Sequence, residues 1–141
     1  MTISFHSEGI HFDLKQKIRH KQWVRDCIHS KKKIQGNISF IFTSNEQLRL
    51  MNREYLNHNS FTDVLTFDYA EKDIISGDIF ISIEQVNINA ELFSVIAEEE
   101  LRRVMIHGVL HLMGFKDSLP EQQAIMREKE NEALHLWLEP V

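Results

Sequence analysis

The sequence has little of what builds disulfide-stapled, fibrous or membrane proteins. Its 141 residues include one cysteine, two prolines and five glycines. Cys27 therefore has no internal disulfide partner, and collagen-like, proline-rich and glycine-rich linker chains are excluded. There is no run of about 18 apolar residues to span a membrane, and no apolar signal-peptide segment near the first residue. We expect a single domain over residues 1–141, located in a reducing cytoplasm.

The charge of the chain is acidic overall but unevenly distributed. The formal net charge is -5, which argues against a protein that wraps nucleic acid. Half of the lysines and arginines nevertheless lie between Lys15 and Lys33, where Asp26 is the only acid. This window predicts either a solvated helix face or a phosphate-binding surface, for which Lys31, Lys32 and Lys33 are the candidate contacts.

The hydrophobic pattern predicts alternating strands and helices. Segments rich in β-branched and aromatic residues predict strands at residues 2–5, 36–42, 63–69 and 77–83. Helical periodicity and capping residues predict helices at residues 13–30, after Ser44, after Glu84, at about 98–113 and from the cap Ser118 to about Leu138. These elements indicate an α+β domain, with one sheet of about four strands covered by helices.

The segment from Val104 to Asp117, VMIHGVLHLMGFKD, is the most informative part of the chain. From Val104 to Phe115 every residue is apolar, Gly or His, which predicts a central, buried helix rather than an amphipathic surface helix. His107 and His111 are four residues apart, so both rings lie on one face of that helix. Imidazoles in apolar surroundings are unfavourable unless each ring has a polar partner.

A divalent metal ion is one partner that both rings can share. His-x-x-x-His on a helix supplies two ligands of a zinc-type site, and Asp117, just past the expected helix end at Gly114, can supply a third. Three protein ligands leave one position for water, which is the catalytic pattern. The alternative is that His107 and His111 are core histidines bonded to backbone or acidic groups. The other six histidines lack such grouping, and we expect surface or capping roles for them.

The residues between the histidines restrict the chemistry. Zincin proteases carry a catalytic Glu directly after the first His, whereas this chain has Gly108, so peptide hydrolysis by that route is not expected. A metal-activated water, with its pKa lowered toward about 7, can instead attack a phosphodiester while the cation offsets charge on the phosphoryl oxygens. Zinc, one ion per chain, is the expected metal, although nickel, iron and cobalt suit the same ligands. No general base other than metal-bound hydroxide is identified.

Three linked motifs resemble a known family. HGVLHLMGFKD (107–117) resembles the signature of the YbeY-like single-strand-specific metallo-endoribonucleases, which are bacterial ribosome-maturation factors. MNREYLNHNSFTDVLTF (51–67) is similar to the family's Thr-Asp-Val-Leu-Ser-Phe segment and the residues before it, and GDIFIS (77–82) resembles its Gly-Asp-Ile strand. The motifs occur in the family's order and spacing. The fold implied is α+β, with a mixed sheet and the metal-binding helix at its centre.

The resemblance also implies roles for individual residues. It makes His107 and His111 the first two metal ligands. Asp117 stands where the family usually has a third His, and is still a competent ligand. Leu56 stands where the family has an Arg in its cleft, and a leucine cannot hold phosphate. His58 stands where the family often has Lys, so it is a candidate donor or cation in the substrate cleft.

Thr62 and Asp63 match the family's Thr-Asp pair. Their functional interpretation is a polar lining of the substrate cleft beside the metal. The alternative interpretation is a turn at the start of a strand, in which Asp63 bonds local backbone. The sequence leaves both open.

The function implied by the resemblance is zinc-dependent cleavage of single-stranded RNA, in 16S rRNA 3′-end maturation and ribosome quality control. The implied partners are ribosomal RNA and the ribosome or its proteins. Two alternatives stay open. One is a ribosome-associated RNA-binding factor with a structural metal, which Leu56 favours, and the other is a metallohydrolase acting on a different electrophile.

Overall fold

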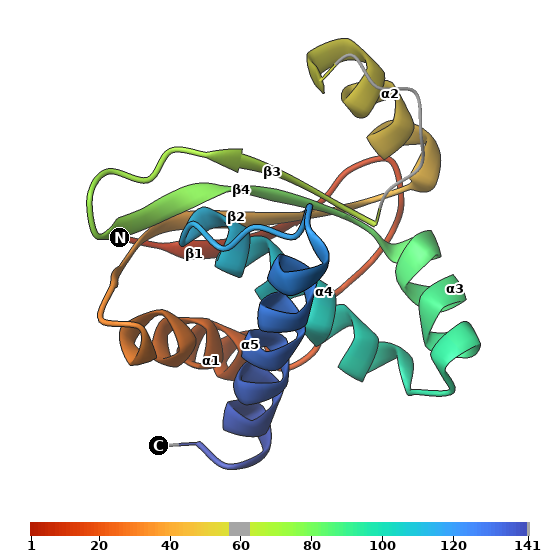
Figure 1. The fold of residues 1–141 in the computed structure, drawn as a ribbon. Coiled ribbons are helices and arrows are strands. Elements are labelled where there is room, and N and C mark those ends of the chain that lie inside the picture. Colours follow the sequence, from red (N-terminus) through yellow and green to blue (C-terminus); the bar gives the residue numbers. More distant parts are fainter. Residues whose placement is uncertain (57–62, 141) are drawn as a thin grey trace.

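A computed structural model describes residues 1–56 and 63–140 (Figure 1). Over these residues the chain forms a mixed sheet with three helices packed along one face and a fourth, α2, against the other. In chain order the elements are β1 (Ile3–Ser7), α1 (Lys17–Ser30), β2 (Ile34–Thr43), α2 (Asn45–Leu56), β3 (Val64–Asp68), β4 (Ile74–Ser82), α3 (Ile83–Phe93), α4 (Ala97–Leu112) and α5 (Pro120–Leu138). The expected α+β class is confirmed.

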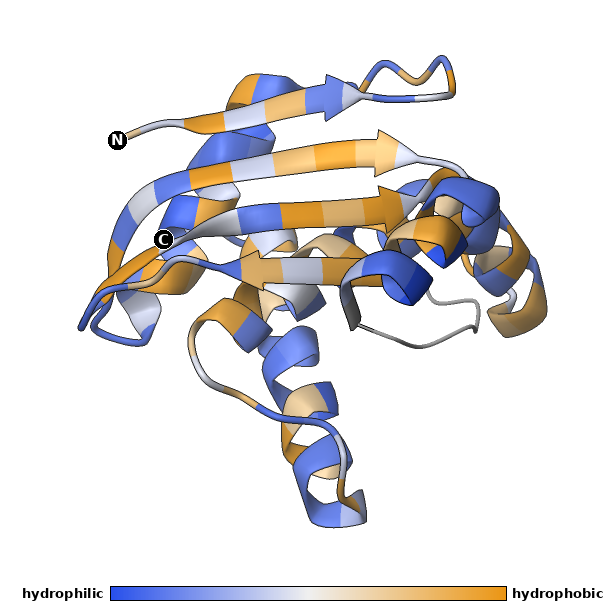
Figure 2. Cartoon of the chain, turned by 90° about the horizontal axis from the view of Figure 1, so that it is seen from above, coloured by the Kyte–Doolittle hydropathy of each residue, from blue (hydrophilic) through white to orange (hydrophobic). Residues whose placement is uncertain are grey.

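The strand order is β1-β2-β4-β3. β1 pairs parallel with β2, because α1 carries the chain back between them. β2 pairs parallel with β4, because β3, which follows α2, runs in the opposite direction before β4 begins. β3 and β4 are joined by a short connection and pair antiparallel. The sheet is therefore mixed, as the resemblance implies, and its four strands overlap the four predicted segments. Figure 2 shows the central strands β2 and β4 as mainly hydrophobic.

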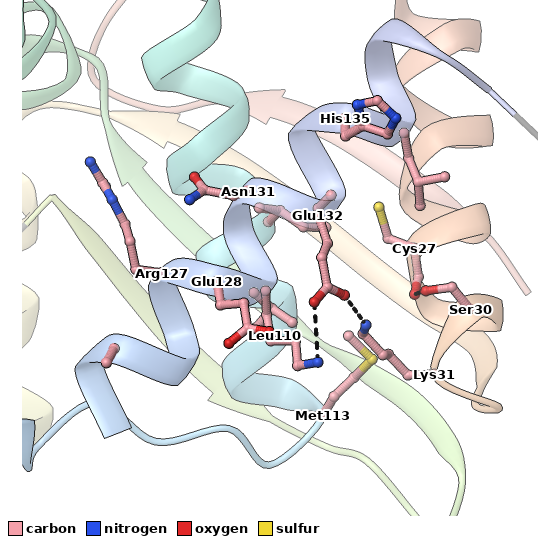
Figure 3. A pocket seen from close by; sticks show the side chains of 15 residues that line it. Cys27, Ser30, Lys31, Leu110, Met113, Arg127, Glu128, Asn131, Glu132 and His135 are labelled. Carbon is pink, nitrogen blue, oxygen red and sulfur yellow. Dashed lines mark hydrogen bonds and ion pairs between the residues drawn. The ribbon is translucent and has the colours of Figure 1, made fainter. Parts of the chain in front are cut away.

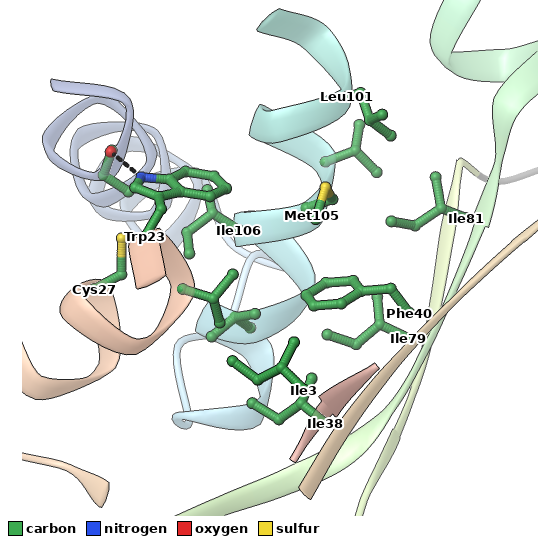
Figure 4. Close-up of a cluster of buried hydrophobic side chains, with 14 of the residues drawn as sticks. Ile3, Trp23, Cys27, Ile38, Phe40, Ile79, Ile81, Leu101, Met105 and Ile106 are labelled. Atoms are coloured by element: carbon green, nitrogen blue, oxygen red, sulfur yellow. Dashed lines mark hydrogen bonds between the residues drawn. The ribbon is translucent and has the colours of Figure 1, made fainter. Parts of the chain in front are cut away.

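Alternating residues of the strands build a core on each face of the sheet. Ile79 and Ile81 of β4 are fully buried among the residues of α1, α4 and α5, in the larger cluster of Figure 4. Phe80, between them, points to the opposite face, where it packs against Leu48 and Met51 of α2. The period-two pattern of β4 therefore fixes which face of the sheet carries α4.

Helix α4 is the central helix that the sequence predicts. Val104, Met105, Ile106, Gly108, Val109, Leu110 and Leu112 are all buried. His107 and His111 are only half-buried, with side chains 22% and 26% exposed, so they lie along the accessible edge of the otherwise buried stretch of residues 104–112. The chain leaves the helix at Gly114, whose positive φ of 99° suits glycine. None of the described helices, α4 included, combines the length and apolarity that a membrane crossing requires.

Three local expectations were wrong. The first helix begins at Lys17 rather than near Asp13, because Gln16 adopts a left-handed conformation (φ 56°) that interrupts helical geometry. The last helix is capped by Gln122, whose side-chain oxygen accepts hydrogen bonds from the backbone N–H groups of Ser118 and Leu119, and not by Ser118.

His20 is the third correction. It is a core histidine rather than a surface or capping residue, with only 4% of its surface exposed. Its ring lies 4.6 Å from that of Trp137, and its Nδ1 lies 2.9 Å from the Gln16 carbonyl oxygen. Burial lowers the pKa of His20, so the neutral imidazole is favoured.

Gly108 allows α4 to lie directly on β4. A Cβ at this position would stand 2.7 Å from Cγ2 of Ile79, which is fully buried and cannot move aside cheaply. We expect Gly108→Ala to lower the free energy of unfolding by about 1–2 kcal/mol, since overpacking outweighs the gain in helix propensity. Chemical denaturation measures this. In an Ile79→Ala background, the same glycine substitution should be much less destabilising. Equal effects in both backgrounds would show that contact with Ile79 is not the cause.

Candidate metal centre

Three side chains converge at the C-terminal end of α4. Nε2 of His107 lies 3.0 Å from Nε2 of His111, and Oδ2 of Asp117 lies 3.2 Å and 3.3 Å from these two nitrogens. A tetrahedral ion with ligand distances of about 2.0–2.1 Å holds its ligand atoms about 3.3–3.4 Å apart. The three atoms therefore nearly match the spacing that such an ion imposes. We call these residues the His-His-Asp group, and it could hold a metal ion.

The local structure explains how the group is assembled. His107 and His111 follow each other by one turn of α4, so their rings meet on one face. The reversal at Gly114 is held by backbone hydrogen bonds from Gly114 to His111 and from Phe115 to Leu110. This turn brings the following segment back toward the helix, and Asp117 reaches the two rings from there.

A buried carboxylate on α5 orients His107. Oε2 of Glu130 lies 2.7 Å from Nδ1 of His107, and Oε1 accepts a hydrogen bond of 2.9 Å from Arg103. Glu130 itself is only 5% exposed. With Nδ1–H of His107 donating to this carboxylate, the lone pair of Nε2 faces His111 and Asp117. A carboxylate that fixes the tautomer of a metal-binding histidine in this way also increases its basicity.

The pKa shifts reflect the same contacts. Burial alone lowers the pKa of His107, but the hydrogen bond and charge of Glu130 outweigh it, so that the pKa of His107 is raised. Burial raises the pKa of Glu130, but its hydrogen bonds to His107 and Arg103 outweigh burial and lower the pKa. Glu130 is therefore held as the anion by two donors.

In the part of the chain that the structure describes, two hollows adjoin the His-His-Asp group, and both are lined by His107, Asp117 and Asp63. The α3 hollow, of about 300 Å³, lies among α3, α4 and α5 and includes Glu100, Arg103 and Glu130 in its wall. The β3 hollow, of about 320 Å³, runs along β3 and includes His111 and Thr66. The group thus lies where two open spaces meet, within reach of a ligand from solvent.

The other predicted site residues have mixed positions. His58 and Thr62 fall outside the described residues. Asp63 lines both hollows and lies 3.5 Å from the side-chain amide of Asn89, and burial raises its pKa. The cleft-lining role of Asp63 stays a prediction. Leu56 is the last residue of α2.

The predicted phosphate contacts at the end of α1 lie away from the group. Lys31 pairs with Glu132 of α5 at 2.7 Å, and Lys33 pairs with Asp73 at 2.9 Å. Lys31 and Glu132 line another hollow, of about 1080 Å³, between α1, α4 and α5, which shares Arg127 with the α3 hollow. Figure 3 shows the Lys31–Glu132 pair there. Lys32 is exposed. Two of the three lysines are thus engaged in ion pairs within the protein.

The sequence interpretation missed Glu130. A signal for it exists, because Glu130 occupies the buried face of α5 together with Met126, Ala133 and Trp137. An acid at helical spacing within an apolar face implies a buried partner. That partner is His107, and it meets Glu130 only because α5 packs against α4. The sequence pattern does not specify this packing.

Comparison with known proteins shows the family to which this chain belongs. The family model "Endoribonuclease YbeY" matches residues 3–137. This chain belongs to the endoribonuclease YbeY family. Among its relatives, Endoribonuclease YbeY of Flavobacterium psychrophilum is 47% identical, covering 96% of each chain. The Bacteroides thetaiotaomicron protein of the same name is 41% identical, covering 95% of this chain and 98% of its own.

A solved structure supports the fold of this YbeY family member. The solution structure of a Thermotoga maritima protein superposes with a TM-score of 0.64 at 27% identity. The match covers 97% of this chain and 92% of that one. The family resemblance noted in the sequence is therefore confirmed, and with it the assignment to a family of RNA-cleaving hydrolases.

The contact of Glu130 with His107 generates a prediction about metal affinity. Glu130→Gln keeps a hydrogen-bonding group but removes the charge, and we expect zinc affinity to fall about 10- to 100-fold. Competition with a chromophoric chelator measures the change. Glu132→Gln is the matched control, because Glu132 lies on the same helix but pairs with Lys31. Equal zinc affinity in the two variants would contradict a role for Glu130 in orienting the ligand.

Proposed function

We propose that this chain is a zinc-dependent endoribonuclease that cleaves single-stranded ribosomal RNA in the cytoplasm. The observation that carries the proposal is the convergence of the His107, His111 and Asp117 ligand atoms to within 3.3 Å of one another. Membership of the endoribonuclease YbeY family supports RNA as the substrate. The motif resemblance supports the finer assignment to 16S rRNA 3′-end maturation and ribosome quality control, with the ribosome or its proteins as partners.

The donor set suits zinc. Two imidazole nitrogens and one carboxylate oxygen are typical ligands of catalytic zinc, and three protein ligands leave a position open. Nickel or another divalent metal suits the same donors, so the choice of zinc is part of the proposal. When bound, such an ion supplies an activated water and offsets charge on the phosphoryl oxygens.

The residues of the chain contribute binding and orientation. His107 and His111 present their Nε2 atoms from the rigid, buried helix α4, and Asp117 adds one negative charge. Glu130 accepts a hydrogen bond from Nδ1–H of His107. The ring is so held in the tautomer whose Nε2 lone pair is available to a metal ion. The adjoining hollows, of about 300 and 320 Å³, leave open space beside the group.

Metal content tests the ligand set. Tag-free wild-type protein should contain about one zinc ion per chain by inductively coupled plasma mass spectrometry, and Asp117→Ala should contain much less, because only two ligands remain. Asp78→Ala, which removes a carboxylate on β4 outside both hollows, is the control and should keep its zinc. If the wild type contains no metal, even after zinc is added, the metal site is refuted. The alternative, that His107 and His111 are core histidines bonded to backbone or acidic groups, would then hold.

Loss of a ligand should also abolish catalysis. His111→Ala should remove zinc binding and cleavage of single-stranded RNA while far-UV circular dichroism stays close to wild type, because this side chain is half-buried at the edge of α4. His135→Ala is the matched control, since His135 is 67% exposed on α5. Full cleavage by the His111 variant would refute the metal mechanism. RNA binding without turnover by the zinc-loaded wild type would favour a binding factor with a structural metal.

A further inference from the structure

The α3 hollow contains groups that the metal site does not need. Beyond His107 and Asp117, its lining includes Phe93, the last residue of α3, and Arg127, on the second turn of α5. One side chain offers an aromatic face and the other a guanidinium. Both belong to the same open space as two of the candidate metal ligands.

Phe93 is unusually exposed for a phenylalanine. Its exposed fraction is 58%, so its ring adds little to the hydrophobic core. The neighbouring Leu92 is 72% exposed but does not line the hollow. The aromatic ring is therefore placed where a ligand in the hollow meets it. Unstacked bases of single-stranded nucleic acids bind such rings by stacking, largely regardless of sequence.

Arg127 differs from the other arginine of this hollow. Arg103 is committed, because it donates to Glu130 and to Asn131 at 2.9 Å each and its side chain is only 18% exposed. Arg127 is 60% exposed and approaches Glu130 only to 3.6 Å, beyond hydrogen-bond distance. Figure 3 shows its side chain extending away from the Lys31–Glu132 pair. Arg127 can thus turn to an incoming phosphate while Arg103 keeps Glu130 in place.

The charge balance of the α3 hollow makes the guanidinium of Arg127 important. Among the residues that the structure describes, four carboxylates line it, those of Asp63, Glu100, Asp117 and Glu130, against the guanidiniums of Arg103 and Arg127. A divalent ion on the His-His-Asp group would bring the formal total to zero. Without Arg127, the acids would repel a phosphodiester even with the ion bound.

We propose that Phe93 and Arg127 form a nucleotide subsite, in which the ring of Phe93 stacks on a base of single-stranded RNA and Arg127 holds a phosphate next to the scissile one. This rests on the proposed function, since the hollow adjoins the proposed metal site. It assigns the path of the RNA strand on one side of that site to the space between α3 and α5.

The test measures binding separately from cleavage. Zinc-loaded protein is titrated into a short fluorescein-labelled oligouridylate RNA, anisotropy gives Kd at several salt concentrations, and electrophoresis verifies that the RNA is intact. Arg127→Gln should weaken binding about fivefold to tenfold and reduce the slope of log Kd against log salt by about 0.7, the value for one phosphate contact to a single strand. Phe93→Ala should weaken binding about fivefold or more with an unchanged slope, because stacking releases no counterions.

Matched variants separate this subsite from general effects. Lys129→Gln removes the same charge from α5 outside the α3 hollow, where Lys129 pairs with Glu132, and Leu92→Ala removes an exposed apolar side chain next to Phe93. Both should bind RNA like the wild type. If Lys129→Gln lowers the salt slope as much as Arg127→Gln, the contact is diffuse charge and the assignment of Arg127 is wrong. If Leu92→Ala weakens binding as much as Phe93→Ala, the face is a general apolar surface and stacking is refuted.

Cleavage kinetics complete the test. In the subsite variants KM should rise while kcat changes little, provided the bound strand still reaches the metal. If the wild type cleaves RNA and both variants retain wild-type Kd and KM, the subsite is refuted and the proposed function stands. If the wild type does not cleave RNA, the proposed function fails, and the binding constants and salt slopes still decide whether Phe93 and Arg127 contact the strand.

Discussion

The buried carboxylate of Glu130 is the contact on which the arrangement of this molecule depends. A carboxylate that is only 5% exposed is strongly unfavourable unless donors surround it, and here His107 and Arg103 supply them from α4. The same contact that makes α5 compatible with α4 also fixes the tautomer of a candidate metal ligand. One hydrogen bond thus both joins α5 to α4 and sets the tautomer of His107. A movement of α5 would therefore disturb His107.

The packing of α4 determines which of its edges holds the candidate metal ligands. Gly108 lies against Ile79 of β4, and the flanking apolar residues fill the space toward α1 and α5. The remaining edge opens toward Asp63, α3 and the two hollows, and His107 and His111 occupy it. The alternation of side chains along β4 and the contact of Gly108 with Ile79 therefore determine the position of the imidazole rings. A rigid helix supports both rings, which favours ligand atoms held at fixed spacing.

Much of this organisation was predictable because it depends on local spacing. The four strands follow from β-branched runs, and the His-x-x-x-His spacing with a glycine turn predicted the convergence of His107, His111 and Asp117 that the structure shows. The sequence could not supply what depends on contacts distant in the chain. Glu130 meets His107 only through helix packing, and His20 is buried because Trp137 arrives from the other end of the chain. Gln16 shortened α1 through a left-handed conformation that residue propensities do not specify.

The position of Asp117 has a consequence for conformational entropy. The two histidines belong to a helix that is ordered by its own core, whereas Asp117 belongs to the connection between α4 and α5, outside any regular element. If His107, His111 and Asp117 all held an ion, that connection would become a short cross-linked loop and would lose conformational freedom. Metal binding would therefore be coupled to the local order of residues 113–119 rather than to global folding. Hydrogen exchange along this connection would report whether the site is loaded, independently of any substrate.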